Sequence, residues 1–279
     1  VSPLKHDFPM LEGAMIHARR MQPVIVTPLT LAGAMAPVTM SGAVTLSLAE
    51  GLAAIVLLQV VNPGAPCAIG TFTSNVDMKS GAPAFGTPEH VQMQIGSGQL
   101  ARHIGLPWRS ASGSASNVAD MQSATETNTA LWGALMANAT VTIHAAGWLE
   151  GGLTFGYEKF INDIEALQMV AELCQKPSGS GAELAWDAIA DVAPGGHFFA
   201  TQHTMDRYQT AFYQPLVADL SNFGQWTEAG SATSTERATA IWKANLRDFE
   251  APAGAGDRVE RIAKYIGQKT AEGGAHPLD

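Results

Sequence analysis

The sequence predicts an α/β fold of the TIM barrel type, in which parallel strands alternate with helices that lie outside the sheet. Short apolar runs rich in β-branched residues alternate along the chain with longer helical segments. The short runs are apolar throughout, as expected for strands that are covered on both faces. Polar side chains follow several of these runs, and a barrel builds its chemistry at the carboxyl ends of its strands.

Five strands are predicted with boundaries set by turn residues. They lie at 24–26, 67–72, 106–110, 140–143 and 197–201. We expect them to be parallel and to follow chain order in one curved sheet, because crossover connections are right-handed. A closed barrel of this type has eight strands. Either some strands escape this pattern, or the chain forms only part of a barrel.

Helix boundaries are predicted from capping residues. Thr87 precedes Pro88 at a helix start that is expected to run to about His103, with Gly105 closing it. Thr233 and Glu236 form a capping box for a helix to Phe249. Further helices are expected at 3–20, 44–61, 117–138, 158–175 and 183–192. Residues 1–250 are therefore predicted to form the catalytic domain, and 251–279 a linker with a short polar helix.

Composition excludes several classes of protein. The net charge is −9 with no basic stripe, so nucleic acid is not an expected partner. The apolar segment 44–61 is long enough to span a membrane, but Glu50 and Gln59 interrupt it and favour a buried helix. Cys67 and Cys174 lie far apart, which indicates a reducing cytoplasm and gives no zinc pattern. The first residues do not resemble a signal peptide.

The stretch from Thr140 to Gly152 is the strongest candidate site. Thr140 to Ile143 is predicted to be a buried strand, and His144, Trp148 and Glu150 follow among small residues and glycines. The ordinary alternative is that the tryptophan belongs to the core and the histidine caps the strand. The chain has no G-x-G-x-x-G, P-loop, G-x-S-x-G or H-E-x-x-H motif, which argues against dinucleotide and common hydrolase sites.

Four runs resemble the trimethylamine–corrinoid methyltransferase family. They are Val26 to Thr39, Phe72 to Glu89, His144 to Leu153 and Gly195 to Phe199. The resemblance implies a TIM barrel that moves a methyl group from a tertiary or quaternary amine to the cobalt of a corrinoid. That corrinoid is carried on a partner protein and reacts as cob(I)alamin. Family members are longer at the N-terminus, so the resemblance implies an incomplete barrel that lacks its N-terminal strands.

The resemblance also narrows the substrate. No position here is written as pyrrolysine, which the archaeal trimethylamine enzymes carry, so the chain resembles the glycine betaine-type branch. A quaternary amine is already a charged leaving group and needs no acid, whereas a tertiary amine must first be protonated. We therefore expect turnover of a quaternary amine and none of trimethylamine, with no metal bound by the protein itself.

Site roles follow from this chemistry. Aromatic faces hold a quaternary ammonium by cation–π attraction, and Trp108 and Trp148 are the candidates at strand ends. A substrate carboxylate requires a cation or donor, and Arg109, His144, Asn75 and His197 are the candidates. Glu150 is predicted to stabilise the ammonium or to anchor the glycine loop. The ordinary alternatives are a core role for Trp108, a surface ion pair for Arg109 and a turn role for Asn75.

Two predictions describe the geometry of this site. Asn75, Trp108, His144 and Trp148 are expected to converge in one cavity at the carboxyl end of the sheet. The imidazole of His144 is expected inside that cavity, and the guanidinium of Arg109 at its rim.

Other classes of function remain open. The chain is alternatively a non-catalytic remnant, or one half of a split methyltransferase that needs a complementing chain or a second copy of itself. An open barrel would leave two strand edges unpaired, which is an association hazard. A different barrel enzyme such as a lyase ranks last, because no paired carboxylates or metal-ligand spacing support it.

Overall fold

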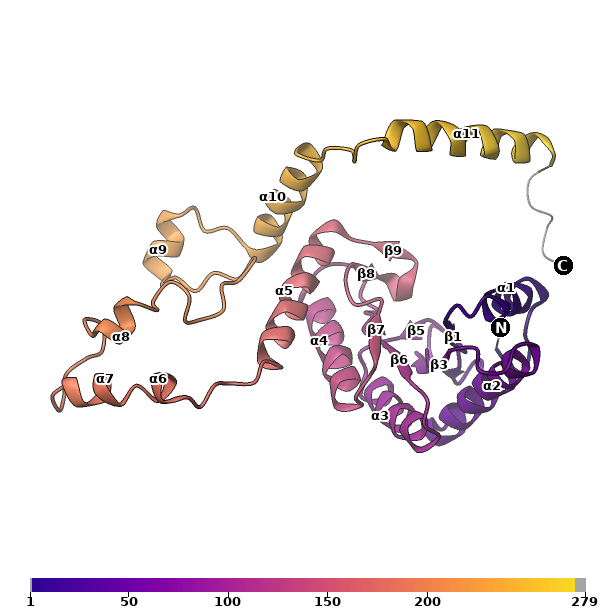
Figure 1. Cartoon of the computed structure of the whole chain (residues 1–279), viewed down its shortest axis with the longest axis horizontal. Helices are drawn as coiled ribbons and strands as arrows, with labels where there is room; N and C mark the ends of the chain where they lie inside the picture. The colour runs from indigo at the N-terminus through magenta and orange to yellow at the C-terminus, as the bar shows by residue number, and fades with distance from the viewer. Residues whose placement is uncertain (1, 274–279) are drawn as a thin grey trace. The chain divides into compact units, whose positions relative to one another are not determined.

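The computed structural model describes residues 2–273 (Figure 1). The chain divides into two compact units, residues 1–239 and residues 240–279. All strands of the described residues lie in the first unit. The candidate site therefore belongs to that unit alone.

A four-stranded parallel sheet forms the centre of the first unit. Its strands are β1 (Val24–Val26), β3 (Cys67–Gly70), β6 (Trp108–Ala111) and β7 (Val141–Ile143), in the order β1-β3-β6-β7. Each neighbouring pair is parallel, which confirms the predicted direction and chain order for these four strands. The sheet does not close on itself in the described residues, so a complete barrel stays a prediction.

The fifth predicted strand, 197–201, is wrong. These residues form a turn and loop between two short helices. The side chains of Phe198 and Phe199 are exposed, so no other described element packs over the apolar run that suggested a strand. A strand needs a neighbour to satisfy its backbone groups, and none pairs with this segment among the described residues.

The two faces of the sheet have different environments. Residues paired in a parallel register point to the same face, and successive residues alternate. Val26, Ile69 and Trp108 are therefore on one face, and they pack with Ile55 and Ala101 in a hydrophobic core. Gly70, Arg109 and Val141 are on the opposite face. The first face is the outer, helix-covered one, and the second is the inner one.

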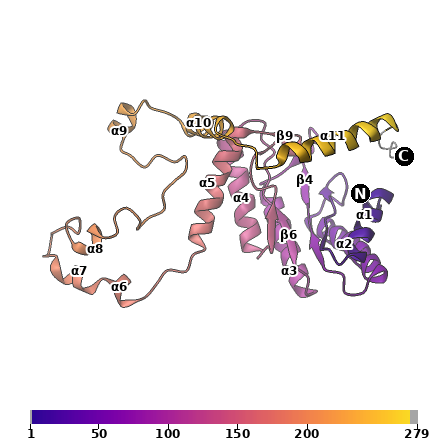
Figure 2. The ribbon, with the colours of Figure 1, turned by 45° about the horizontal axis from the view of Figure 1, so that its top comes forward.

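The outer face is covered by helices in chain order. The helices of this layer are α1 (Phe8–Arg19), α2 (Met40–Val61), α3 (Pro88–His103), α4 (Met121–Met136) and α5 (Tyr157–Leu173). Each contacts the next one in the sequence, and Figure 2 shows α3, α4 and α5 as neighbours. The predicted β–α alternation is confirmed over this part of the chain.

Helix α2 is apolar on all sides. By length and composition it is the one helix among residues 2–273 that satisfies the requirement for crossing a bilayer, and 33% of its most apolar window is buried. Its residues Ala43, Ser47, Ala54 and Leu58 recur at helical spacing and are buried. One stripe of α2 therefore packs as a core helix does, against β1, β3 and α3.

Local capping signals place the helix ends accurately. Thr87 accepts a hydrogen bond from the backbone of His90 at the start of α3, and Gly105 follows the helix with φ +72°. Thr233 and Glu236 form the predicted capping box. The N-cap of α4 is Asp120, whose carboxylate accepts from the backbone N–H of the third helical residue.

Short strands inside the predicted loops complete the first unit. They are β2 (Leu31–Ala32), β4 (Ser74–Val76), β5 (Pro83–Ala84), β8 (Trp148–Leu149) and β9 (Thr154–Phe155). The first three form a small sheet in the order β2-β4-β5, and the last two pair antiparallel around a 3-10 turn, η1 (Glu150–Gly152). Sequence patterns missed them because they lack the run of β-branched residues that identified β1 and β7.

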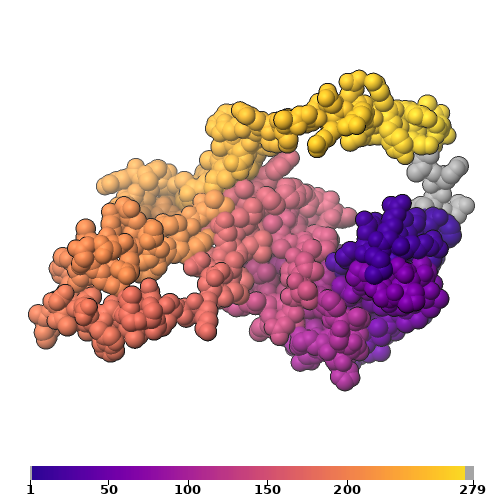
Figure 3. Space-filling model, in the orientation of Figure 1, coloured from indigo at the N-terminus to yellow at the C-terminus, as the bar shows by residue number. Residues whose placement is uncertain are grey.

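Short helices dominate the chain after α5. They are α6 (Gly181–Leu184), α7 (Trp186–Asp191), α8 (Gln202–Met205) and α9 (Phe223–Glu228), and the longer helix α10 (Ser234–Arg247) follows them. The single helix predicted at 183–192 is interrupted because Ala185 has φ +51°. The terminal helix α11 (Ala255–Ala271), yellow in Figure 3, is longer than expected and exposes Val259, Ile262, Tyr265 and Ile266.

Candidate functional site

An aromatic cluster lies just beyond the carboxyl ends of two sheet strands. Phe72 follows β3, and His144 follows β7 directly. The ring centroids of His144 and Trp148 are 4.5 Å apart, and those of Phe72 and Trp148 are 5.6 Å apart. Phe85 adds a fourth ring at 6.0 Å from the indole. The structure therefore brings His144 and Trp148 together at the edge where chemistry was expected.

Glycines allow the indole of Trp148 to lie where it does. A Cβ on Gly113 would come within 3.1 Å of this ring, and a Cβ on Gly152 within 2.2 Å. Gly152 also has φ +101°, a conformation that other residues rarely adopt. Gly113 and Gly152 thus make room for an indole that is half-buried between two backbone segments.

Arg109 is the buried cation of the site. Its side chain comes from β6 on the inner face and is only 2% exposed. The carbon Cζ lies 5.4 Å from the ring centroid of Phe72. Its atoms Nε and Nη1 have no hydrogen-bond partner among the described residues. Burial lowers the pKa of Arg109 to about 10, which still leaves the group charged at neutral pH.

The predicted positions of Arg109 and His144 are reversed. We expected the guanidinium at the rim and the imidazole inside, but Arg109 is buried and His144 is exposed. The reason is their position in the sheet. Arg109 lies within an interior strand, whereas His144 follows the last residue of the edge strand β7, with φ +57°.

Trp108 does not join the cluster, so this part of the prediction is wrong. Its indole lies on the outer face with Ile69 and Ala137, and its Nε1–H donates to Thr71 Oγ1 at 3.1 Å. Neighbouring strand residues alternate between faces, and Arg109 takes the inner one. The ordinary alternative, a core role, is the correct one for this tryptophan.

Asn75 and His197 are placed elsewhere. The side-chain oxygen of Asn75 accepts from Thr87 Oγ1–H at 2.9 Å, which connects β4 to the start of α3. His197 is exposed in the loop before α8, where its ring lies 5.7 Å from that of Phe199. Among residues 2–273, neither residue makes a hydrogen bond or ring contact with the aromatic cluster, and a substrate-binding role for each stays a prediction.

Glu150 lies at the start of the η1 turn. Its carboxylate is exposed, and its backbone N–H donates to the carbonyl oxygen of Ser116 at 2.9 Å. This backbone contact joins the turn to the serine-rich loop after β6. The predicted anchoring of the glycine loop is thus made by the backbone of Glu150, and a catalytic role for its carboxylate stays a prediction.

The electrostatics of the site favour a neutral imidazole beside a charged guanidinium. Desolvation and the positive charge of Arg109 both lower the pKa of His144 below its ordinary value of 6.5. This shift favours the uncharged form of His144 at neutral pH, and that form still presents a ring face and ring nitrogens. Among residues 2–273, no group of three His, Cys, Asp or Glu side chains is arranged to hold a metal ion.

Sequence reasoning missed Phe72 and Phe85. The ring of Phe72 contacts those of Phe85, His144 and Trp148 in tilted or edge-to-face geometry, and the Arg109 guanidinium lies over it. Its position at the end of a predicted strand was the available signal, because the same criterion selected Trp108.

The indole Nε1 of Trp148 is buried without a partner in the described residues, so it adds a third free N–H donor atom to Nε and Nη1 of Arg109.

The fold and this site define a class of protein. It is an α/β protein with parallel strands whose carboxyl edge combines aromatic faces with unpaired N–H donors, an arrangement suited to a small ligand with a cationic and an anionic end.

Comparison with known proteins gives the family. The model of the trimethylamine methyltransferase (MTTB) family matches residues 1–274, and the chain belongs to that family. The chain is 34% identical over 275 residues to the glycine betaine methyltransferase of Desulfitobacterium hafniense (strain Y51), covering 98% of this chain and 57% of that protein. This confirms the resemblance seen in the sequence.

Two trimethylamine methyltransferases are also similar. The chain is 35% identical over 234 residues to MttB of Methanosarcina barkeri, covering 82% of this chain and 46% of that protein. It is 32% identical over 230 residues to MttB of Desulfitobacterium hafniense (strain DSM 10664 / DCB-2), covering 82% and 45%. The chain thus spans about half the length of the curated relatives it matches.

Proposed function

We propose that this chain carries the amine-binding part of a methyltransferase whose substrate is a small quaternary amine with a carboxylate, of the glycine betaine type. The observation that carries the proposal is Arg109, a buried guanidinium with two unpartnered nitrogens beside an aromatic cluster. A buried charge without a partner is costly, so a site that keeps one is suited to an anionic ligand group. Similarity to a glycine betaine methyltransferase supports the same substrate.

The two ends of a betaine match the two parts of the site. The quaternary ammonium would lie against the rings of Phe72 and Trp148, where cation–π attraction contributes about 0.5–2 kcal/mol. The carboxylate would accept hydrogen bonds from Nε and Nη1 of Arg109 and from Nε1 of Trp148. Guanidinium–carboxylate pairs are planar and directional, so they also fix the orientation of the substrate.

Binding and orientation are the main tasks of the protein in this reaction. In this proposal the methyl acceptor would be the cob(I)alamin of a corrinoid protein, which would supply the nucleophile, and the neutral tertiary amine would be the leaving group. A quaternary nitrogen leaves without accepting a proton. The neutral state of His144 suits this chemistry, because an imidazolium there would repel the ammonium. The corrinoid partner and a cytoplasmic location belong to this proposal.

The proposal is tested by comparing three ligands on the chain. Glycine betaine carries both charges, tetramethylammonium carries only the cation, and trimethylamine must be protonated to be a good leaving group. Isothermal titration calorimetry should show binding in that order of affinity, and loss of cob(I)alamin absorbance should occur with the betaine. Turnover of trimethylamine at a comparable rate would overturn the substrate assignment, and so would equal affinity for the first two ligands.

A further inference from the structure

The turn that carries His144 and Trp148 is held by the first turns of helix α5. The backbone N–H of Gly147 donates to Asp163 Oδ2 at 2.9 Å, and its carbonyl oxygen accepts from the N–H of Gly156 at 3.0 Å. Gly147 has φ +81°, and a Cβ there would lie 2.2 Å from the ring of Phe155. Both backbone polar groups of Gly147 are therefore hydrogen-bonded to α5 or to its N-cap residue, Gly156.

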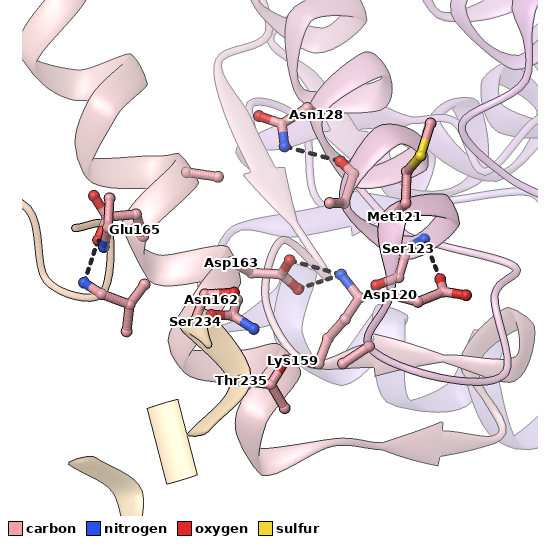
Figure 4. A pocket seen from close by; sticks show the side chains of 15 residues that line it. Asp120, Met121, Ser123, Asn128, Lys159, Asn162, Asp163, Glu165, Ser234 and Thr235 are labelled. Carbon is pink, nitrogen blue, oxygen red and sulfur yellow. Dashed lines mark hydrogen bonds and ion pairs between the residues drawn. The ribbon is translucent and has the colours of Figure 1, made fainter. Parts of the chain in front are cut away.

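Asp163 is itself fixed by a buried lysine. Nζ of Lys159 donates to both carboxylate oxygens of Asp163 at 2.6 Å and to Oγ1 of Thr127 at 2.6 Å. Lys159 is 1% exposed, and Asp163 is 4% exposed. The pair lies beside a cavity of about 430 Å³, which is lined by α4, α5, residues 119–120 and 217–218 and the start of α10 (Figure 4). The three N–H donors of the ammonium are all used, so the pair does not offer that cavity a free cation.

A buried ion pair is a poor choice for stability alone. Taking both charges out of water costs about as much as their attraction returns, and well-packed apolar residues often replace such pairs without loss. An apolar pair would not supply an acceptor for the Gly147 N–H. That acceptor is the feature that connects the pair to the aromatic cluster.

We propose that Lys159 and Asp163 are positioning residues that fix the Gly147 turn and so hold the His144 and Trp148 rings against each other. The amine-binding role of the Trp148 ring, beside which the uncharged His144 ring lies, rests on the proposed function above. In this scheme Asp163 provides the acceptor, and Lys159 holds the carboxylate in the one orientation that reaches Gly147. Neither side chain touches the substrate.

Two double variants separate the acceptor from the charges. Lys159→Met with Asp163→Asn removes both charges and keeps a side-chain oxygen for Gly147. Lys159→Met with Asp163→Leu removes the charges and the acceptor at similar volume. The matched control is Lys264→Met, which breaks an exposed i,i+4 pair with Glu260 in α11. Circular dichroism establishes that each variant is folded before it is compared.

Two readouts need no substrate. Hydrogen exchange of the Gly147 amide should be at least tenfold faster in the Leu variant and within threefold of the parent chain in the Asn variant. The imidazole proton signals of His144, shifted by the indole ring, should move toward free-histidine values only in the Leu variant. Unchanged exchange and unchanged shifts in the Leu variant would overturn the positioning role, as would equal changes in both double variants.

A third readout connects the turn to the ligand. The dissociation constant for glycine betaine should rise at least tenfold in the Leu variant and stay within threefold in the Asn variant. If the turn loosens while betaine affinity is unchanged, the positioning role for the substrate is overturned. If the parent chain binds no amine but the turn responds as expected, the proposed function fails and the structural part of the inference stands.

Discussion

Replacing Arg109 by methionine should weaken betaine binding while making the unliganded protein more stable. Methionine is an unbranched apolar side chain that replaces the stem of Arg109 and removes the guanidinium with its charge. Hydrogen bonds to charged groups contribute about 1.5–3 kcal/mol each. Two unpartnered nitrogens then imply a loss of about 3 kcal/mol or more, and 1.4 kcal/mol corresponds to a factor of ten in affinity, so the dissociation constant should rise at least ~100-fold.

The change in stability has the opposite sign. In the unliganded chain the Arg109 guanidinium is desolvated without a counter-ion among the described residues, which destabilises the folded state. Arg109→Met removes that penalty, and we expect a gain of about 1–3 kcal/mol in the free energy of unfolding, the size of one unsatisfied buried polar group. A core arginine with a purely structural role would give a loss.

Calorimetry and thermal unfolding test both effects. Glycine betaine should lose affinity for Arg109→Met, whereas tetramethylammonium, which lacks a carboxylate, should keep its affinity or gain slightly. Arg102→Met is the control. Arg102 lies near the end of α3, donates to the backbone carbonyl of Ala137 at the end of α4, and is not part of the cluster. An equal loss for both ligands, or a destabilised variant with normal betaine binding, would refute the assignment.

Three further predictions concern single side chains. Trp148→Ala should weaken tetramethylammonium binding by about 0.5–2 kcal/mol in calorimetry, and Trp148→Phe should retain most of it. The pKa of His144, followed by NMR, should lie below 6.5 and should rise in Arg109→Met, because one of its two causes is removed; an unchanged pKa would contradict their proximity. Burial lowers the pKa of His90 to about 4, so the unfolded state binds the proton first as pH falls. Urea unfolding should therefore show stability decreasing from pH 6.5 to 4 by roughly 3 kcal/mol, and His90→Gln should flatten this slope.

The helix ends and four strands were predictable because their signals are local. Thr87 satisfies a backbone N–H at the start of α3 whatever packs around it, and Gly105 adopts positive φ at the other end. The predicted strand at 197–201 failed because a strand depends on a partner. Its apolar residues resemble those of β3 and β7, but in the described residues no neighbouring strand completes the pairing.

The candidate site was predicted in part for a similar reason. The sequence places Trp108 and Arg109 next to each other in one predicted strand, and both types of side chain suit a betaine. Alternation allows only one of two neighbours to face the site, and the choice depends on which face the helices cover. In the structure Ile69 pairs with Trp108, and both side chains lie on the helix-covered face, so Arg109 faces the site. This pairing between strands depends on the tertiary structure and cannot be read from the local sequence pattern.

The contrast between two tryptophans shows why Trp148 is the better candidate for ligand binding. The indole Nε1–H of Trp108 donates to Thr71 within the helix-covered core, so its polar atom is satisfied by the fold. The corresponding atom of Trp148 is buried without a partner among the described residues, although glycines on both sides hold the ring tightly. Leaving a buried N–H unpaired costs about 1–3 kcal/mol, and a ring placed only for packing gains nothing from that cost. A ligand carboxylate that accepts from this N–H and from Arg109 would recover the loss at both groups.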